Sequence, residues 1–401
     1  MWPCLEVIIV RNSPAVVGTG QIGYQDELPE TYAELAGKAT RAAIDDAGMD
    51  LRAVDAVVFS QAPEAFFGVA HPERWAVDHV GATKVPSMRI HTGGTTGGSA
   101  AQVGAYHVAS GRYNTVLVVG AEKVKENQSP QTVLNSIFDP LTERPFGLNT
   151  INTVAMQAVR YMEKFGIERA DLARVAVRSW RHAQDNPHAH LHGELTIDDV
   201  LEAPTLSWPL GRYDSCPSSS GGCALVISDE STVEERSLTP AWITGLAAAS
   251  GTYYIGDRMA NGDVDFADAG YLEPVAGRAY DQAGIEDPGE ALDVAELYTP
   301  FTSFEYPMIE AVDICDPGGS AAADAAGAFD LDGRLPINPS GGALCSNPIA
   351  VTALIRVAEA ADQVRGAGGP VQIPDVECAL ATGVGGISQF YTAMVLGADP
   401  A

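Results

Sequence analysis

The two halves of this chain repeat one pattern, and that repetition limits its fold more than any other feature. The run Ala43-Ile-Asp-Asp-Ala-Gly-Met49 returns as Ala279-Tyr-Asp-Gln-Ala-Gly-Ile285. An apolar run that reads as a strand follows each copy, and a Gly-Gly pair ahead of a helix comes later in both halves, at Gly93 and at Gly341. Because these features recur in the same order, they indicate a duplicated α/β unit.

The first half alternates apolar strands with segments of helical periodicity, which is typical of a parallel-rich sheet with helices on its faces. Leu35, Ala39 and Ala43 recur at helical spacing, so a helix is predicted over residues 31–48. The other expected helices span residues 71–80, 97–110 and 348–361, and the expected strands span residues 14–18, 54–60, 88–91, 115–120 and 292–297.

Residues 125–214 differ from the sequence around them, because they are richer in Arg, His, Asn and Pro. A segment of this length with its own helical patterns is too long to be a simple loop. We therefore predict a loop domain inserted into the first unit. The predicted division gives residues 1–235 to the N-terminal half, which carries the insertion, and residues 236–401 to the C-terminal half.

Several motifs resemble those of the thiolase family. The run Met88-Arg-Ile-His-Thr-Gly-Gly-Thr-Thr-Gly-Gly-Ser-Ala-Ala101 resembles the loop and buried helix that carry the thiolase nucleophile. Within and beyond the insertion, Trp208-Pro-Leu210, Asp214-Ser-Cys-Pro217 and Ile337-Asn-Pro-Ser-Gly-Gly342 resemble the sterol-carrier-protein branch, whose members are often named lipid-transfer proteins. The resemblance implies a duplicated thiolase fold of five layers, α-β-α-β-α, with a lid-like loop domain over acyl-CoA.

The side chains that thiolases use for catalysis are replaced in this chain. A thiolase needs a thiolate to take the acyl group, a histidine to activate it and a second acid/base. Gly94 stands at the cysteine position, and Asn347 stands where the Gly-His-Pro motif has its histidine. The usual His-Asp pair is Tyr298-Thr299, and the final Cys-x-Gly motif becomes Thr382-Gly-Val-Gly-Gly386. Four replacements at four matching places exclude an acyl-enzyme on residue 94.

The residues that remain predict a frame that binds an enolate oxygen. Backbone N–H groups around Gly94, Gly385 and Gly386, with the Asn347 amide, can hold the oxygen of a CoA thioester enolate. The helix that begins near Thr96 points its positive end the same way. Such a frame suits retro-aldol cleavage of a 3-hydroxyacyl-CoA, which passes through an enolate without an acyl-enzyme.

Two side chains are candidates for proton transfer in that reaction. Tyr298 is our choice of acid/base, because it replaces a catalytic histidine at the end of a strand. Its pKa, ordinarily about 10, would have to be lowered, or water would have to bridge, for it to act as a base at neutral pH. The alternative is a tyrosine that lines the acyl tunnel. His91 is either a second acid/base or a core residue with satisfied hydrogen bonds.

Other residues are candidates on weaker grounds. Cys345 is either a relocated nucleophile or a small buried residue behind Gly342. Arginines cluster in residues 169–181, and Arg178 and Arg181 either bind the CoA phosphates or belong to a solvated helix face. Further candidates close to the reacting groups are Thr95, Thr96, Thr382, Tyr253 and Tyr254.

Two patterns point weakly to other ligands. Gly18-Thr-Gly-Gln-Ile-Gly23 fits the GxGxxG of dinucleotide sites, but no helix opens directly after it, so a strand-to-loop turn is preferred. His188, His190 and His192 alternate, but no carboxylate or cysteine stands at zinc-site spacing beside them. We therefore predict no metal and no bound cofactor, with a coenzyme A thioester as the substrate.

The charge balance argues against nucleic acid as a partner. The net charge is −28 with only five lysines, and such a surface repels phosphate backbones. The apolar runs are too short to span a bilayer, and the N-terminus does not read as a signal peptide. Six unevenly spaced cysteines do not form a disulfide framework, which favours free thiols in a reducing cytoplasm.

Three functions stay open. The first is retro-aldol cleavage, because cysteine-less relatives resemble the aldolases of sterol side-chain degradation. Those are homodimers bound to a small zinc-ribbon/OB-fold partner, and they tend to carry tyrosine where Asn347 stands. The second is acyl transfer of the acetyl-CoA acetyltransferase type through an unidentified nucleophile, and the third is a non-catalytic acyl-CoA-binding scaffold. We also expect an exposed edge strand at residues 115–120 to continue the sheet across a twofold axis.

Overall fold

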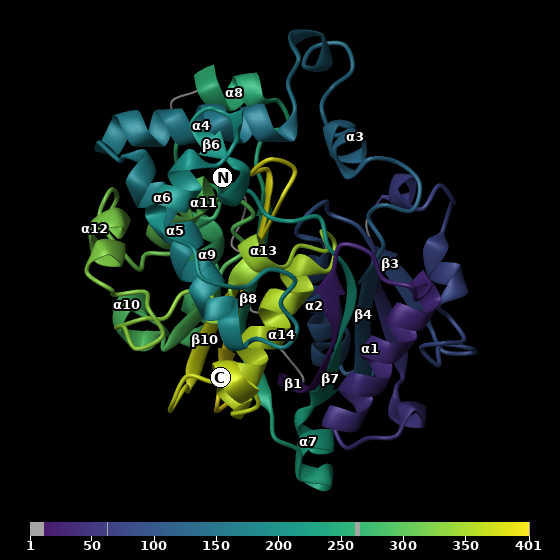
Figure 1. The fold of residues 1–401 in the computed structure, drawn as a ribbon. Helices are drawn as coiled ribbons and strands as arrows, with labels where there is room; N and C mark the ends of the chain where they lie inside the picture. Colours follow the sequence, from purple (N-terminus) through teal and green to yellow (C-terminus); the bar gives the residue numbers. More distant parts are fainter. Residues whose placement is uncertain (1–11, 62, 261–264, 401) are drawn as a thin grey trace.

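Two sheets meet edge to edge at the centre of the molecule. The computed structural model describes residues 12–61, 63–260 and 265–400. Within these residues, nine strands are joined in the order β3-β2-β4-β7-β1-β8-β11-β10-β9. β1 and β8 pair only between residues 15–16 and 241–242, so the strands on either side form two sheets (Figure 1). The strands are β1 (Pro14–Gln25), β2 (Ala56–Ser60), β3 (Ser87–Ile90), β4 (Thr115–Glu122), β7 (Ser220–Asp229), β8 (Ala241–Ser250), β9 (Val294–Glu296), β10 (Cys378–Gly385) and β11 (Phe390–Gly397).

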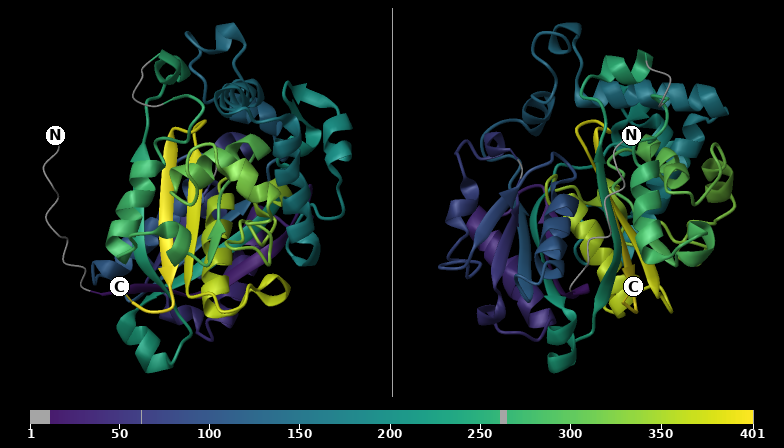
Figure 2. Two further views of the ribbon diagram at one scale, coloured as in Figure 1. Left: turned by 90° about the vertical axis from the view of Figure 1, so that its left-hand side faces the viewer. Right: turned by 180° about the vertical axis from the view of Figure 1, so that it is seen from behind.

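Helices fill three layers around these sheets (Figures 1 and 2). α1 (Tyr32–Asp46) covers the outer face of the first sheet, and α9 (Glu273–Ala283) covers the outer face of the second. α2 (Thr96–Ala109) and α14 (Thr352–Arg365) lie between the sheets. This arrangement confirms the predicted five layers. The shorter helices of this framework are α7 (Glu230–Arg236), α8 (Ile255–Ala260), α10 (Pro288–Ala291), α11 (Thr302–Ala311), α12 (Ser320–Ala325) and α13 (Gly342–Cys345).

Two glycines of β1 let α1 approach the first sheet closely. A Cβ atom on Gly18 would lie 2.3 Å from the Ala43 carbonyl oxygen, and one on Gly20 would lie 2.3 Å from that of Ala39. The GxGxxG run therefore lies inside a 12-residue strand and serves helix packing. Both interpretations from the sequence, a dinucleotide site and a strand-to-loop turn, are wrong for this run.

The strand directions and edges differ from those predicted. β2 runs parallel to β3 and β4, and β9 runs parallel to β10, but the other neighbouring pairs are antiparallel. β4 is not an exposed edge, because β7 returns after the insertion and pairs with it; β3 and β9 form the edges among the described strands. The predicted helix at residues 71–80 is only a short 3₁₀ turn, Pro72–Trp75.

The inserted domain leaves the first sheet after β4; its first helix, α3 (Pro130–Asn135), lies above the first half, and the rest of its helices lie over the second half of the chain (Figure 1). Its helices α4 (Thr150–Phe165) and α5 (Arg169–His182) pack against α11. It also contains α6 (Ile197–Glu202), β5 (Thr205–Ser207) and β6 (Leu210–Gly211). Our proposed boundary after residue 235 falls in the last turn of α7, which follows β7 of the first sheet and precedes β8 of the second along the chain. Throughout the described ranges, every helix is too short or too polar to cross a bilayer.

Candidate active site

A cavity of about 690 Å³ lies under the inserted domain. Its volume is that of a pocket for a small organic ligand. Its walls come from the segments that follow β3 and β9, from the β10–β11 turn, and from α3, α4 and α8. The predicted site residues that line it are His91, Gly94, Tyr253, Tyr298, Asn347, Gly385 and Gly386.

Tyr298 occupies the space next to the missing nucleophile. A Cβ atom on Gly94 would lie 3.4 Å from the Tyr298 hydroxyl oxygen and 2.5 Å from the Val384 carbonyl oxygen. The second distance is too short for any side chain, so the backbone around Gly94 leaves no room for a cysteine. Burial is the main cause that raises the pKa of Tyr298, with Cys216 second. The phenol is therefore neutral at physiological pH, opposite to the lowered pKa that a tyrosine base would need.

Asn347 connects Tyr298 to the rest of the site. Its Oδ1 accepts hydrogen bonds from the Tyr298 hydroxyl, at 2.9 Å, and from the Thr352 hydroxyl, at 2.7 Å. Its Nδ2 donates to the Sγ of Cys216, at 3.0 Å. In this state the Tyr298 hydroxyl keeps its proton and donates its hydrogen bond to Asn347, so the amide fixes the direction of the phenol O–H.

Cys216 is a cavity residue that the sequence analysis did not single out. It lies in the segment 215–218 that lines the cavity after the inserted domain, and its backbone N–H donates to the Pro300 carbonyl oxygen at 2.9 Å. Burial raises the pKa of its thiol to about 12, so the thiol is not ionised at neutral pH. The only available signal was the motif Asp214-Ser-Cys-Pro217, which gives no indication that its cysteine faces the site.

His91 lines the same cavity from the end of β3. His91 is an exposed residue, but partial desolvation of its imidazole lowers its pKa, and the positive charge of Arg89 adds to the effect. None of the hydrogen bonds among the described residues involves its ring, so the interpretation as a core histidine with satisfied bonds is not supported. A neutral imidazole that faces a cavity is suited to accept a proton.

Two glycine turns meet at the wall of the cavity. A Cβ atom on Gly385 would lie 2.7 Å from the Thr92 carbonyl oxygen and 2.9 Å from the nitrogens of Gly94 and Thr95. Only glycine allows these backbones to touch. Immediately afterwards Ile387 and Ser388 adopt left-handed φ angles of 52° and 60°. Such angles strain a β-branched residue by roughly 1–3 kcal/mol, and strain of this kind is common at functional sites.

The other sequence candidates support this wall from outside the cavity or serve the core. Thr95 bonds to Thr392 through their hydroxyls, and Thr96 donates to the Gly93 carbonyl. The Thr382 hydroxyl accepts a hydrogen bond from the Tyr298 backbone N–H at 3.1 Å, and this bond fixes the position of the Tyr298 backbone. Cys345 is buried, with its thiol near the Ser179 carbonyl, and it does not line the cavity. Tyr254 is exposed beside Tyr253.

The two arginines predicted to bind CoA, Arg178 and Arg181, do not form an exposed basic patch at the cavity. Arg178 is 2% exposed and is paired with Glu305 and Asp324, because its face of α5 packs against α11 and α12. This burial contradicts the prediction that Arg178 binds CoA phosphates. Arg181 is exposed on the same helix, pairs with Asp330 and does not line the cavity.

The alternating histidines are used separately. His190 shares a hydrogen bond with the Ser219 hydroxyl at 2.9 Å, and Ser219 in turn accepts from the Asn347 backbone N–H at 3.1 Å. The His188 carbonyl accepts from the Tyr24 N–H. Within the described ranges, no group of three or more potential metal ligands is brought together.

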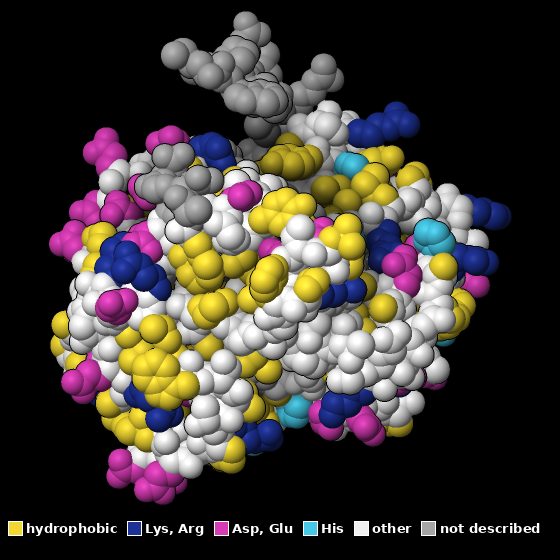
Figure 3. All heavy atoms as spheres, turned by 90° about the horizontal axis from the view of Figure 1, so that it is seen from above, with side chains coloured by type: hydrophobic (Ala, Val, Ile, Leu, Met, Phe, Trp, Pro, Cys, Tyr) yellow, Lys and Arg dark blue, Asp and Glu magenta, His cyan; other side chains and the backbone are white. Residues whose placement is uncertain are grey.

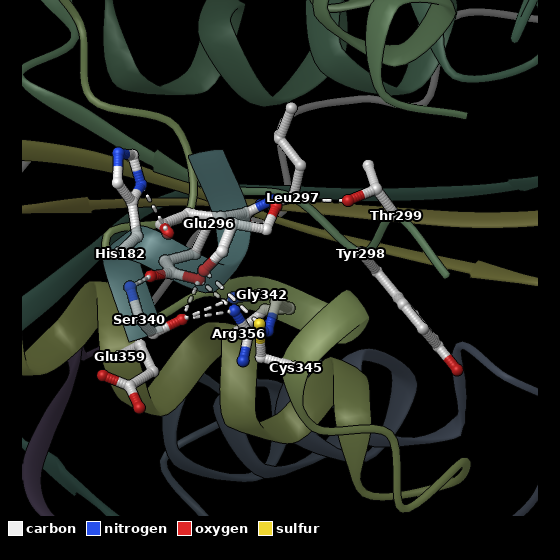
Figure 4. A network of polar contacts seen from close by, with 12 residues as sticks. His182, Glu296, Leu297, Tyr298, Thr299, Ser340, Gly342, Cys345, Arg356 and Glu359 are labelled. Atoms are coloured by element: carbon white, nitrogen blue, oxygen red, sulfur yellow. Dashed lines mark hydrogen bonds and ion pairs between the residues drawn. The ribbon is translucent and has the colours of Figure 1, made fainter. Parts of the chain in front are cut away.

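A buried ion pair lies beneath the site (Figure 4). Arg356 of α14 pairs with Glu296 at the end of β9, and the Ser340 hydroxyl bonds to both. In the figure, the Tyr298 side chain points away from this network. The network therefore fixes the backbone from which Tyr298 projects, rather than contacting a ligand.

Comparison with known proteins agrees with this architecture. Residues 7–198 match the family described as "Thiolase, N-terminal domain", and residues 258–398 match "Thiolase C-terminal domain-like". The chain belongs to the thiolase superfamily. As a superfamily member it is a thiolase-like enzyme of the lipid-transfer type that acts on CoA thioesters.

Three relatives of this thiolase-superfamily protein illustrate its range. An acetyl-CoA acetyltransferase from Methanothermobacter thermautotrophicus is 29% identical over 374 residues, which cover 93% of this chain and 96% of the relative. Human sterol carrier protein 2 is 26% identical, over 92% of this chain and 70% of the relative. The solved Ltp2-ChsH2(DUF35) aldolase is 28% identical, covers 98% of this chain and 99% of its own, and superposes with a TM-score of 0.84.

Proposed function

We propose that this protein cleaves the C2–C3 bond of a 3-hydroxyacyl-CoA by a retro-aldol reaction. The observation that carries the proposal is the neutral phenol of Tyr298 at the place where Gly94 leaves no room for a nucleophile. A lipid or sterol side-chain acyl group suits the apolar walls that α4 and α11 give the cavity, through Ile151, Val154 and Phe304. Similarity to a named aldolase supports the same choice.

The proposed reaction needs one base, one enolate site and one acid. His91 accepts the proton of the 3-hydroxyl group, the C2–C3 bond breaks, and an aldehyde or ketone leaves with the C3 oxygen. The electron pair of the broken bond forms the enolate of the shortened thioester. Backbone N–H groups of Gly94 and Gly386 stabilise the enolate oxygen. Tyr298 then protonates C2, and cavity water returns the proton from His91 to Tyr298, so the enzyme ends unchanged.

Mass spectrometry of the CoA products tests the proposal. The purified protein is incubated with 3-hydroxyacyl-CoAs and 3-ketoacyl-CoAs, each with and without free CoA. A shortened acyl-CoA from the hydroxy substrates without free CoA is the expected result. Cleavage of keto substrates only with free CoA would mean thiolase chemistry instead. If the protein turns over none of these substrates, even with a co-purified partner, its function is that of a non-catalytic acyl-CoA-binding scaffold.

The pH dependence provides a separate prediction. Because partial desolvation and Arg89 lower the pKa of His91 below its ordinary 6.5, kcat/KM should fall only when the pH drops below 6.5. The raised pKa of Tyr298 keeps the profile level up to pH 10. His91→Gln should lower kcat about 100-fold and remove the acidic limb.

The matched control is His107→Gln, which changes a histidine of α2 outside the cavity whose pKa burial also lowers. That variant should keep the wild-type profile. An acidic limb that persists in His91→Gln would assign the limb to another group.

A second function, acyl transfer, is favoured by one observation. Cys216 lines the cavity beside Asn347, and relatives carry the name acetyl-CoA acetyltransferase. Its raised pKa speaks against nucleophilic use. If Cys216→Ser abolishes a CoA-dependent cleavage, and if acyl-CoA protects the wild type from iodoacetamide, the thiol is the nucleophile and the retro-aldol proposal fails.

We also propose that the active assembly is a homodimer with a small partner protein; the name of the similar aldolase, Ltp2-ChsH2(DUF35), joins two components in that protein. Tyr253 and Ile137 line the cavity and are exposed, so its mouth lies between α3 and α8. Nearby, Leu141 and Phe146 are each 82% exposed, and hydrophobic side chains are prominent on this upper face (Figure 3). The edge strand β3, with Met88 exposed, is available for pairing with a second copy.

A further inference from the structure

An arginine with unused donors lies in the wall of the cavity. Arg258 of α8 is 6% exposed, and its Nη1 donates to the Ile387 carbonyl oxygen. Its Nε and Nη2 are buried and have no hydrogen-bond partner among the described residues. These two nitrogens share one edge of the planar guanidinium, which is the edge that binds both oxygens of a carboxylate at once.

Two hydroxyl groups share a side chamber with this edge. Ser388 and Tyr391 are buried, and the Ser388 hydroxyl lies close enough to Tyr391 to oppose the burial that raises the pKa of that phenol. Both residues line a small side chamber next to the main cavity, together with Arg258, Gln157 and Tyr271. Arg258 and Ser388 line the main cavity as well, so the chamber adjoins it. The chamber measures only about 10 Å³, which is room for one water, so a larger anion can reach the unpartnered Arg258 nitrogens only from the main cavity, where Ser388 lies as well.

The acidic side chains near Arg258 are engaged elsewhere. Glu143 lines the cavity, but its Oε1 accepts from the Ile255 N–H at 3.1 Å and its Oε2 from the Asp139 N–H at 2.9 Å. Asp265 and Asp268 line the chamber but pair with Arg160 and Lys164. Arg258 has no ion pair among the described residues. A buried charge without a partner is strongly unfavourable, so the site is built to receive an anion.

We infer that Arg258, with Ser388 beside it in the main cavity, binds a carboxylate carried by the acyl group of the substrate. The inference rests on the proposed function for one point, that the thioester lies near Tyr298 and the acyl chain extends along the cavity. The substrate class is then a CoA thioester whose acyl group ends in, or bears, a carboxylate. The remaining apolar walls bind the carbon skeleton between the two ends.

Calorimetric binding of acyl-CoAs that cannot be cleaved tests this inference without relying on turnover. The probes are saturated acyl-CoAs with an ω-carboxylate and their ω-methyl esters, over a series of chain lengths. At one or more lengths the carboxylate should bind about 10- to 100-fold more tightly, the range expected for hydrogen bonds to a charged group. Equal affinity of the two probes at every length overturns the inference.

Variants assign the preference to this site. Arg258→Met should abolish the preference, and Arg258→Lys should retain part of it, because lysine keeps the charge but not the two-donor edge. Arg181→Met removes an exposed arginine outside the cavity and should leave it unchanged. If Arg258→Met does not fold, Ser388→Ala decides, since Ser388 lines the main cavity with Arg258 and loss of its hydroxyl should weaken only the carboxylate probe.

The outcomes separate this inference from the proposed reaction. A carboxylate preference without any cleavage of 3-hydroxyacyl-CoAs would keep the inference and reject the retro-aldol function. Cleavage of 3-hydroxyacyl-CoAs without a preference for the carboxylate would keep the retro-aldol function and reject the inference. The unpartnered nitrogens of Arg258 would then bind only water. A preference that survives in both Arg258→Met and Ser388→Ala would place the carboxylate elsewhere and overturn the assignment.

Discussion

Tyr298→Phe should lower kcat for cleavage of a 3-hydroxyacyl-CoA by roughly 100- to 10,000-fold, the usual contribution of a positioned acid or base. The variant removes one oxygen atom that lies 3.4 Å from where a side chain on Gly94 would begin. It leaves the ring and its packing in place. Because the hydroxyl acts in the transition state, kcat and kcat/KM should fall together while KM changes little.

The fold should tolerate this change. Asn347 loses the Tyr298 donor but keeps the Thr352 hydroxyl on the same oxygen atom. The loss of one buried hydrogen bond costs about 1 kcal/mol of unfolding free energy. Tyr280→Phe is the matched control, because it removes a buried tyrosine hydroxyl that donates to the Val312 carbonyl at 2.9 Å outside the cavity. That control should cost similar stability and no activity.

Steady-state kinetics and thermal unfolding of both variants check the prediction. If Tyr298→Phe keeps more than about a tenth of the wild-type kcat, less than general acid–base catalysis usually supplies, the tyrosine only lines the acyl tunnel. In that case His91 and the glycine turns are left as the reacting frame. A fall in activity that parallels a fall in stability, and that Tyr280→Phe reproduces, would equally remove Tyr298 from the chemistry.

The layers of the fold were predictable because they follow from local pattern and repetition. The copies that end near Met49 and Ile285 lie at the ends of α1 and α9, which cover equivalent faces of the two sheets. The order of the strands was not predictable in the same way. β4 becomes an interior strand only because β7 pairs with it, and the whole inserted domain separates the two strands in sequence.

The centre of the site was predictable because its residues stand at positions that a motif defines. Gly94, Tyr298 and Asn347 were predicted as site residues from their places in motifs that resemble those of the family, and the structure brings them to one cavity. Cys216 was missed because its motif, Asp214-Ser-Cys-Pro217, does not show that the thiol faces the site, and Arg258 was missed because no motif marks it. Their positions depend on how the segment after the inserted domain and the short helix α8 fold over the second half.

The error over Arg178 has a different physical origin. An arginine on a helix with others nearby looks like an exposed basic patch, but the sequence does not show which helix face is buried. Glu305 and Asp324 come from α11 and α12, more than a hundred residues later, and they turn that face into a buried charge cluster. Charges paired in this way are unavailable to a ligand.

Arg356→Met should destabilise the protein by about 3–5 kcal/mol, the usual cost of leaving one member of a buried ion pair alone. Arg356 is 1% exposed, and its partner Glu296 is fully buried. The Arg356 Nη1 also donates to the Ser340 hydroxyl at 2.7 Å, and Ser340 bonds to Glu296 through its own N–H and hydroxyl. Denaturant unfolding measures the loss.

The exposed pair of Arg181 with Asp330 supplies the control (Arg181→Met), because surface ion pairs contribute only about 0–1 kcal/mol. If Arg356→Met costs no more than this control, the buried pair does not hold the two elements together. A cost confined to activity, with unchanged stability, would instead make Arg356 part of the reaction.

The sign of the pH effect distinguishes a buried ion pair from simple packing. Burial raises the pKa of Glu296 from 4.5 to about 7, although Arg356 opposes the shift. The folded state therefore holds this proton more tightly than the unfolded state. The stability that this group contributes is full below pH 4.5 and is lost as the pH rises through 7.

Without Arg356 the pKa of Glu296 must rise further, because the one cause that lowers it most is gone. Arg356→Met should thus cost more stability at pH 8, where wild-type Glu296 is ionised and paired, than at pH 5, where it can remain protonated in both proteins. Equal losses at the two pH values would show that Arg356 stabilises β9 and α14 by packing alone. Tyr298 lies two residues after Glu296. The ion pair between Glu296 and Arg356 therefore also determines how firmly the Tyr298 phenol is held beside Gly94.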